Sequence, residues 1–303
     1  MRRPGGVVTV TSMSTAFSPD TVADLVEKAG PSLVRIDAGH RFGGTGTVWS
    51  ADLVVTASHV VERDEPIELG LADGSTAAAT LVGRDESTDL ALLRVEGKTL
   101  APVTFRGLDG LRVGHFVVAA ARPGRTVRAT FGIVSTLGDA FQTRHGARID
   151  RWLETDAETP PGYSGGVLLD LEGRALGITN RGLVRHAHLI LPHATVQRVV
   201  AELSAHGRVR RGYLGVGVHP VRLPSDVASA LGGQEMGVLV HAVEPKSHAD
   251  EAGILIGDVI VSLDGTKIGS PWELASILRD KVDQTTELQI LRAGKLEKRT
   301  VKT

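Results

Sequence analysis

The residues best suited to chemistry lie in segment 155–166 (TDAETPPGYSGG), where Ser164 stands between Gly162 and the pair Gly165-Gly166. Because glycine has no side chain, such a segment can turn tightly and bring its backbone close to a substrate carbonyl. Backbone N–H groups, here those of Gly162 and Ser164, can then donate to the oxygen that becomes negative during acyl transfer, and each donor is typically worth about 3 kcal/mol. The pattern predicts a nucleophilic serine beside its own oxyanion hole.

A serine hydroxyl is a weak nucleophile at neutral pH, so it needs a base, and the base needs an orienting partner. Two further segments supply both: His59 stands in segment 56–61 (TASHVV) and Asp89 in segment 87–93 (STDLALL). The chain order histidine, aspartate, serine is that of chymotrypsin-type proteins and differs from the order in subtilisins and α/β-hydrolases. We therefore expect catalytic roles for His59, Asp89 and Ser164.

The spacing Gly162-x-Ser164-x-Gly166 also fits the nucleophile elbow of an α/β-hydrolase esterase, which requires a helix directly after the serine. Here two short apolar runs, 167–170 and 175–178, follow instead, with turn residues between them. This pattern predicts a strand, a turn and a second strand. The context therefore disfavours an esterase.

These motifs and their flanks resemble those of bacterial HtrA/Deg-type serine proteases, in which a trypsin-like domain precedes a PDZ domain. The resemblance runs from about residue 21 onward and also covers segments 22–34 and 132–135. It implies a mainly β fold, with a chymotrypsin-like double β-barrel followed by a PDZ domain. It also implies an ATP-independent serine endopeptidase that cleaves unfolded or misfolded proteins, together with a PDZ domain that recruits or regulates.

The nucleophile turn departs from the family pattern. The family usually has asparagine where this chain has Tyr163, Asn-Pro-Gly where it has residues 160–162 (PPG), and proline where it has Val167. Two outcomes are open: the Tyr163 ring points away and the turn is normal, or the turn is distorted and activity is low. The second outcome leaves a peptide-binding scaffold or chaperone with a weak or inactive protease domain as the alternative function.

Composition narrows the function classes. The chain has 303 residues, 42% hydrophobic and 23% charged, which fits two globular domains. Its net charge of -1 gives no overall field to attract nucleic acid. It has no cysteine, no apolar run near the ~20 residues of a membrane helix, and a basic start without the apolar core of a signal peptide. We therefore expect a cytoplasmic protein, with the cell envelope or periplasm as the alternative if an export segment is missing.

The pattern along the chain predicts a flexible segment 1–17, a protease domain 18–206, a linker 207–211 and a PDZ domain 212–303. Helix-start and helix-stop residues predict one helix from Ser18-Pro19 to Gly30 and another from Pro192 to His206. Short β-type runs with turn residues fill the space between them, as in an all-β barrel. The resemblance implies that the first helix helps to hold a homotrimer, and a helix that only caps the barrel is the alternative.

Three segments carry the PDZ prediction: 211–216 (RGYLGV), 251–265 (EAGILIGDVIVSLDG) and a capping box at 270–273 (SPWE) that starts a helix. A peptide is expected to add as a strand, with its terminal carboxylate held by a backbone nest. The residues expected to bind it are Tyr213, Leu214, Gly215 and Val216. A degenerate PDZ domain that only contacts the protease domain is the alternative.

The primary substrate pocket is expected to be lined by two segments that contain no acidic residue, so a small or medium aliphatic P1 side chain is favoured over a basic one. The residues are Ile178, Thr179, Asn180, Leu189, Ile190 and Leu191. The pair His186-x-His188 offers only two ligands, whereas a structural zinc site needs four. We expect no metal and no cofactor.

Overall fold

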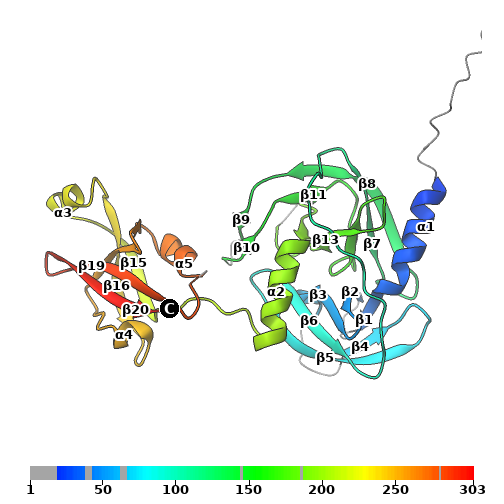
Figure 1. Cartoon of the computed structure of the whole chain (residues 1–303), viewed down its shortest axis with the longest axis horizontal. Helices are drawn as coiled ribbons and strands as arrows, with labels where there is room; N and C mark the ends of the chain where they lie inside the picture. The colour runs from blue at the N-terminus through cyan, green and yellow to red at the C-terminus, as the bar shows by residue number, and fades with distance from the viewer. Residues whose placement is uncertain (1–18, 38–42, 62–66, 144–145, 185–186, 280) are drawn as a thin grey trace, which may run out of the picture. The chain divides into compact units, whose positions relative to one another are not determined.

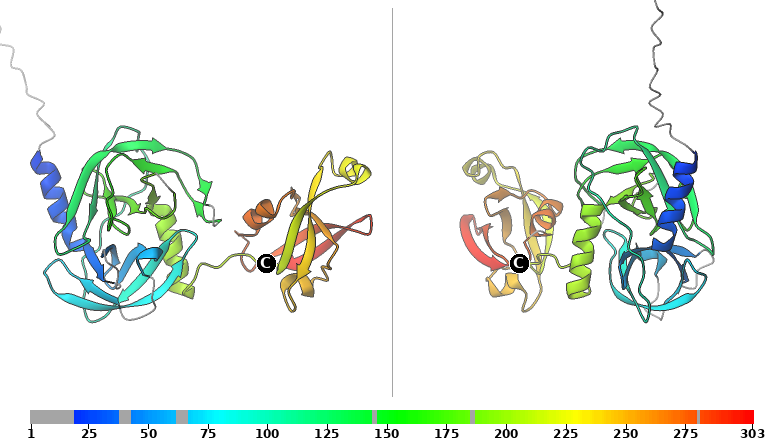
Figure 2. Two further views of the ribbon diagram at one scale, coloured as in Figure 1. Left: turned by 180° about the vertical axis from the view of Figure 1, so that it is seen from behind. Right: turned by 45° about the vertical axis from the view of Figure 1, so that its right-hand side comes forward.

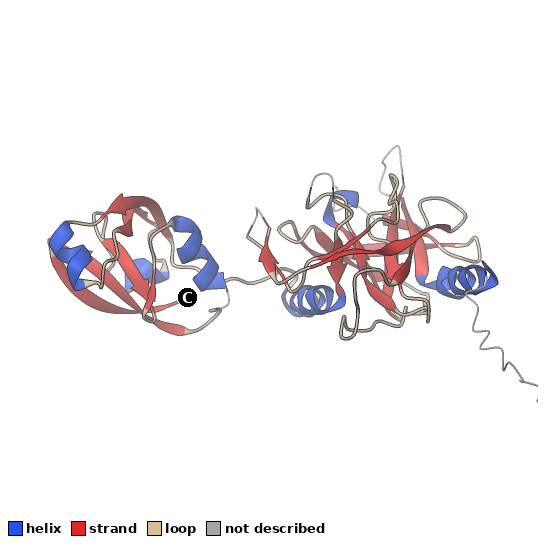
Figure 3. Cartoon of the chain, turned by 90° about the horizontal axis from the view of Figure 1, so that it is seen from above, coloured by secondary structure: helices blue, strands red, loops and turns tan. Residues whose placement is uncertain are grey.

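The computed structural model describes residues 19–37, 43–61, 67–143, 146–184, 187–279 and 281–303. The chain divides into two compact units, Met1–Arg208 and Val209–Thr303 (Figure 1). Strands predominate in both units, and the helices are few and short (Figure 3).

Six antiparallel strands of the first unit close into a barrel in the order β1-β2-β3-β6-β5-β4. Its interior is filled by valine, isoleucine and leucine side chains, whose branched shapes pack well on a pleated surface. The strands are β1 (Leu33–Asp37), β2 (Gly44–Ser50), β3 (Leu53–Ala57), β4 (Ile67–Gly70), β5 (Thr76–Asp85) and β6 (Leu90–Val95).

A second six-stranded sheet has the order β11-β8-β7-β12-β13-β14. It curls back on itself, because Glu154 in its first strand bridges to Leu189 just before its last. Its strands are β7 (Phe116–Ala121), β8 (Arg128–Leu137), β11 (Leu153–Thr155), β12 (Val167–Leu169), β13 (Ala175–Thr179) and β14 (Ile190–Pro192), and a small hairpin joins β9 (Phe141–Gln142) to β10 (Arg148–Ile149). The mainly β, double-barrel prediction is thus confirmed.

Two helices lie on different sides of this unit (Figures 1 and 2). Helix α1 (Pro19–Ala29) buries Leu25 and Ala29 against the outside of the second sheet, and a 3-10 turn, Gly30–Ser32, follows it. Helix α2 (His193–His206) ends at Gly207, whose φ of 68° is the left-handed conformation that glycine accepts readily. Both helices were predicted from the sequence, although the expected cap Ser18 lies outside the described residues.

The second unit contains a six-stranded antiparallel sheet, in which five strands follow the order β15-β16-β17-β19-β20 and β18 pairs with β17. The capping box that opens α5 is present: Glu273 N–H donates to Ser270 Oγ at 3.2 Å, and Ser270 N–H donates to Glu273 Oε2 at 3.1 Å. The elements are β15 (Val216–Arg222), α3 (Ser225–Ala230), β16 (Met236–Val243), α4 (His248–Glu251), β17 (Val259–Leu263), β18 (Thr266–Lys267), α5 (Pro271–Arg279), β19 (Thr285–Arg292) and β20 (Lys295–Lys302).

Candidate active site

The pairing of β3 with β6 brings His59 and Asp89 together. Ala57 pairs with Leu90 at the end of this ladder, so the residues after β3 lie beside the residue before β6. His59 Nδ1 is 2.6 Å from Asp89 Oδ2, and the His59 backbone N–H donates to Asp89 Oδ1 at 2.9 Å. A carboxylate can only accept hydrogen bonds, so Nδ1 carries the ring proton and Nε2 is left as the basic nitrogen.

Asn180 is a third member of this cluster. The sequence predicted it only as a residue of the substrate pocket, not as a partner of Asp89. Its Nδ2 donates to Asp89 Oδ2 at 2.9 Å and to the Asp89 carbonyl at 3.2 Å. The Asn180 Oδ1 in turn accepts from the backbone N–H of Gly182 at 2.8 Å. A Cβ on Gly182 would lie 2.6 Å from Asp89 Oδ2 and 3.1 Å from His59 Nδ1, so only glycine fits over the pair. The Asp89 carboxylate is therefore held by donors from two segments, one around His59 and one at Asn180.

Ser164 sits on a turn whose glycines carry left-handed backbone angles, with φ of 91° at Gly162 and 85° at Gly165. A Cβ on Gly165 would lie 2.0 Å from the Thr45 carbonyl oxygen and 2.6 Å from Thr56 Oγ1. Since Thr56 stands three residues before His59, the turn lies directly against the strand that leads to the histidine. Ser164 itself is only 5% exposed.

Two amides of this turn are available to a ligand. Tyr163 N–H donates to the Pro160 carbonyl at 3.1 Å, and Gly165 N–H donates to the Thr179 carbonyl at 2.9 Å. The amides of Gly162 and Ser164, by contrast, donate to no other residue in the part of the chain that the structure describes. These are the two donors that the sequence assigns to the oxyanion hole.

The Tyr163 ring is directed away from the turn. The residue is 2% exposed and packs in the core of the second sheet with apolar side chains that include Val134 and Leu176. Burial raises the pKa of its phenol, although Arg128 nearby acts in the opposite direction. The ring thus points away from the turn, as in the first of the two outcomes, and the activity of the turn stays a prediction.

The six residues expected to line the primary pocket are nearly inaccessible, with exposures between 0% and 2%. The Ile190 side chain belongs to the core of the second sheet. Asn180 and Thr179 are engaged in hydrogen bonds to Asp89 and to the nucleophile turn. His188 Nδ1 lies 2.8 Å from Thr159 Oγ1, and His186 lies outside the described residues.

The segment expected to hold a peptide carboxylate forms a tight loop before β15. Gly215 has a φ of 82°, and a Cβ there would lie 2.2 Å from the Ser247 Cβ. The amides of Leu214 and Gly215 donate to no described residue. Tyr213 is 55% exposed and its hydroxyl bonds to Glu244, while the Leu214 side chain is buried. Strand β15 is an edge strand, so its outer side is open to another strand.

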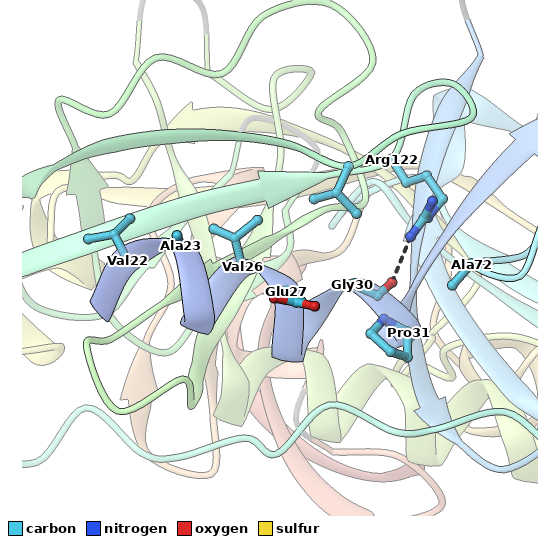
Figure 4. A pocket seen from close by; sticks show the side chains of 9 residues that line it. Val22, Ala23, Val26, Glu27, Gly30, Pro31, Ala72 and Arg122 are labelled. Carbon is cyan, nitrogen blue, oxygen red and sulfur yellow. Dashed lines mark hydrogen bonds between the residues drawn. The ribbon is translucent and has the colours of Figure 1, made fainter. Parts of the chain in front are cut away.

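A pocket of about 710 Å³ lies beside α1 (Figure 4). Val22 and Val26 of the helix form part of its wall, and Arg122 closes one end. The Arg122 side chain is held by backbone carbonyls, with Nη2 donating to Gly30 at 3.0 Å and Nε donating to Leu33 at 2.7 Å. The pocket is therefore mostly apolar, with a fixed cation at its edge.

Comparison with known proteins identifies both units. A family described as "Trypsin-like peptidase domain" matches residues 44–178, and one described as "PDZ domain" matches residues 212–303. The "Periplasmic serine endoprotease DegP" of Escherichia coli K12 is 35% identical over 265 residues, which cover 83% of this chain and 55% of that protein. The "Probable periplasmic serine protease do/HhoA-like" of Haemophilus influenzae is 35% identical over 269 residues, 83% of this chain and 56% of that protein.

The chain thus spans little more than half the length of these curated relatives. Among solved structures, the HtrA-type protease AlgW with decapeptide has a TM-score of 0.71 and 27% identity, covering 92% of this chain and 97% of that one. The serine endoprotease from Yersinia pestis has a TM-score of 0.69 and 25% identity, covering 92% of this chain and 96% of that one.

The prediction of a cytoplasmic protein is wrong. It depended on the absence of a recognisable export segment, whereas the curated relatives are named as periplasmic proteases and point to the cell envelope. No helix among the described residues has the length and apolar character needed to cross a bilayer. By its trypsin-like peptidase domain, its PDZ domain and its relatives, this chain belongs to the HtrA-type serine protease family.

Proposed function

We propose that this protein is a serine endopeptidase that works through an acyl-enzyme. The observation that carries the proposal is the 2.6 Å contact between His59 Nδ1 and Asp89 Oδ2, next to a turn that presents Ser164 with two amides free to donate. The curated relatives are named as serine endoproteases, which favours this function over that of an inactive scaffold.

In the proposed reaction, Ser164 Oγ attacks the scissile carbonyl carbon while its proton passes to His59 Nε2. The negative oxygen of the tetrahedral intermediate accepts from the amides of Gly162 and Ser164. His59 then gives the proton to the departing amine, and the C–N bond breaks to leave the acyl-enzyme. A water molecule then attacks the acyl-enzyme by the same steps, with His59 as the base, and releases the carboxylic acid product and free Ser164. Asp89 keeps the imidazole in one tautomer and stabilises its charged form throughout.

The proposed substrates are unfolded or misfolded proteins of the periplasm or cell envelope, which present extended segments to the cleft. We expect a non-basic P1 residue with a small or medium aliphatic side chain, because segments 178–180 and 189–191 contain no acidic group to pair with a basic one, although the structure leaves these residues only 0–2% exposed.

The PDZ domain is proposed to bind peptide C-termini. A peptide would extend the sheet at the free edge of β15, and the amides around Gly215 would receive its carboxylate. Ile277 on α5 packs against the same core as Val216 and Val218 of β15, so α5 would form the opposite wall of the groove. Titration of a peptide against its C-terminally amidated form tests this, because only the free carboxylate should bind.

We also propose a homotrimer held in part by α1. The apolar pocket lined by Val22 and Val26 offers a surface for another copy of the chain (Figure 4). Light scattering after size exclusion should give three times the chain mass for the wild type and a smaller mass for Val26→Asp. Thr21→Asp is the matched control, because Thr21 is exposed on the same helix and does not line the pocket.

Casein degradation by wild type and Ser164→Ala tests the proposed activity. Wild type should produce fragments, and the variant, folded to the same circular dichroism spectrum, should produce none. If neither protein cuts casein and both suppress the aggregation of an unfolded protein, the scaffold function replaces the protease.

A further inference from the structure

Four consecutive carbonyl groups of the nucleophile turn are each tied back by a donor from a neighbouring strand. The Gly162 carbonyl accepts from Thr45 Oγ1 at 2.7 Å, and the Ser164 carbonyl accepts from the Thr45 backbone N–H at 3.3 Å. The Gly165 carbonyl accepts from Thr47 Oγ1 at 2.8 Å, and the Tyr163 carbonyl accepts from the Thr179 hydroxyl. Thr45 and Thr47 lie on β2 of the first barrel and Thr179 lies on β13 of the second sheet, so both barrels grip the turn.

The direction of these bonds sets the direction of the amides. In a trans peptide the carbonyl of one residue and the N–H of the next lie in one plane and point in opposite directions. The Tyr163 carbonyl accepts from the Thr179 hydroxyl and from the Gly166 N–H at 2.8 Å, and it thereby fixes the orientation of the Ser164 N–H, which is one of the two oxyanion donors. The Gly162 carbonyl, held by Thr45, shares its plane with the Tyr163 N–H, which is no oxyanion donor. Rotation of either plane would break a buried hydrogen bond, which is costly.

The donor roles of these hydroxyls are well defined. Thr45 Oγ1 accepts from the Arg122 backbone N–H at 3.0 Å, which leaves its own proton for the Gly162 carbonyl. Thr179 is 0% exposed and its backbone also bonds to the turn, through Gly165 N–H at 2.9 Å and the Gly166 carbonyl at 2.9 Å. Both threonines are fully buried, so bulk solvent does not reach either hydroxyl.

Resting on the proposed protease function, we propose that Thr179 is a positioning residue that holds the oxyanion hole in its reactive form by orienting the Ser164 amide. The oxyanion hole stabilises charge only when its donors are aimed beforehand at the position of the oxyanion. A loosened peptide plane therefore weakens binding of the transition state more than binding of the substrate. The effect should appear in kcat and leave KM nearly unchanged.

The matched pair Thr179→Val and Thr195→Val tests this inference. Both remove one fully buried threonine hydroxyl, but Thr195 Oγ1 donates to Asp150 Oδ2 at 2.7 Å and not to the nucleophile turn. We expect Thr179→Val to lower kcat about 10- to 100-fold with KM within about twofold, less than the loss of a whole donor. Thr179→Ser, which keeps the hydroxyl, should restore most of the rate, and Thr195→Val should change kcat by less than about threefold.

A peptide aldehyde that forms a tetrahedral adduct with Ser164 supplies a second measurement. Its inhibition constant should rise in Thr179→Val by about the factor by which kcat/KM falls, whereas a purely structural defect would lower only the fraction of folded enzyme. The inference is overturned, and the proposed function left standing, if folded Thr179→Val keeps its kcat and its aldehyde inhibition, or if Thr195→Val loses as much activity as Thr179→Val. A wild type without any turnover would overturn the proposed function as well.

Discussion

Replacement of Asp89 by asparagine should disable the base without removing any packing volume. The Asp89 Oδ2 accepts from His59 Nδ1 and from Asn180 Nδ2, and Oδ1 accepts from the His59 backbone N–H. An asparagine in either orientation places its NH₂ group opposite a donor. When the NH₂ group of this asparagine faces His59 Nδ1, it favours the other histidine tautomer. In that tautomer Nε2 carries the proton and can no longer take one from Ser164.

The expected loss in kcat is about 10⁴-fold, or about 5.4 kcal/mol, the size found when the same change is made in chymotrypsin-type triads. Cleavage of a chromogenic peptide and the rate of fluorophosphonate labelling should fall together, while the melting temperature changes little.

Asp170→Asn is the control, because Asp170 is also 8% exposed but is paired with Arg106 and Arg174. It should reduce stability and leave kcat within about twofold. Full kcat in folded Asp89→Asn would refute the assignment of the orienting carboxylate.

Three other predictions follow from single contacts. Tyr163→Phe should keep both activity and stability, while Tyr163→Ala should cost about 3–5 kcal/mol in denaturant unfolding by opening a core cavity; an inactive but stable Tyr163→Phe would show that the phenol acts in the turn. Burial alone would raise the pKa of Asp258, but hydrogen bonds from Arg292 and the Leu255 N–H lower it. The ionised pair of Asp258 and Arg292 therefore stabilises the PDZ domain above about pH 4, and this stability is lost as the pH falls further. Arg292→Met should therefore move acid unfolding to higher pH by circular dichroism, and an unchanged midpoint would contradict the pairing. Gly215→Ala should abolish binding of a C-terminal peptide and leave cleavage of a short PDZ-independent peptide intact, unless the loop holds no carboxylate.

The local pattern of the sequence was enough to predict most elements of the fold. Helices α1 and α2 follow from helix-start and helix-stop residues at their ends, and β12 and β13 follow from two apolar runs around a turn. These features depend on neighbours in the chain, so they can be recognised without knowing the rest of the structure. The strand after Ser164 also disfavours the α/β-hydrolase alternative, which needs a helix there.

The contacts that shape the site were not predictable in the same way. Asn180 reaches Asp89 across 91 positions of sequence, and Thr45 reaches Gly162 across 117. Neither Asn180 nor Thr45 belongs to a recognisable local sequence motif. Their roles depend on contacts that form only when the two barrels are assembled. The orientation of the Tyr163 ring likewise could not be predicted, because it depends on the packing of distant residues in the core of the second sheet.

The most direct test of the account is the site of covalent modification by a fluorophosphonate. Intact-mass analysis and peptide mapping of the full chain should find one adduct, on Ser164, that forms slowly or not at all in His59→Ala and is absent in Ser164→Ala. An adduct on another residue, or a folded wild type that takes up no label while casein stays intact, would contradict the proposal that Ser164 is an activated nucleophile.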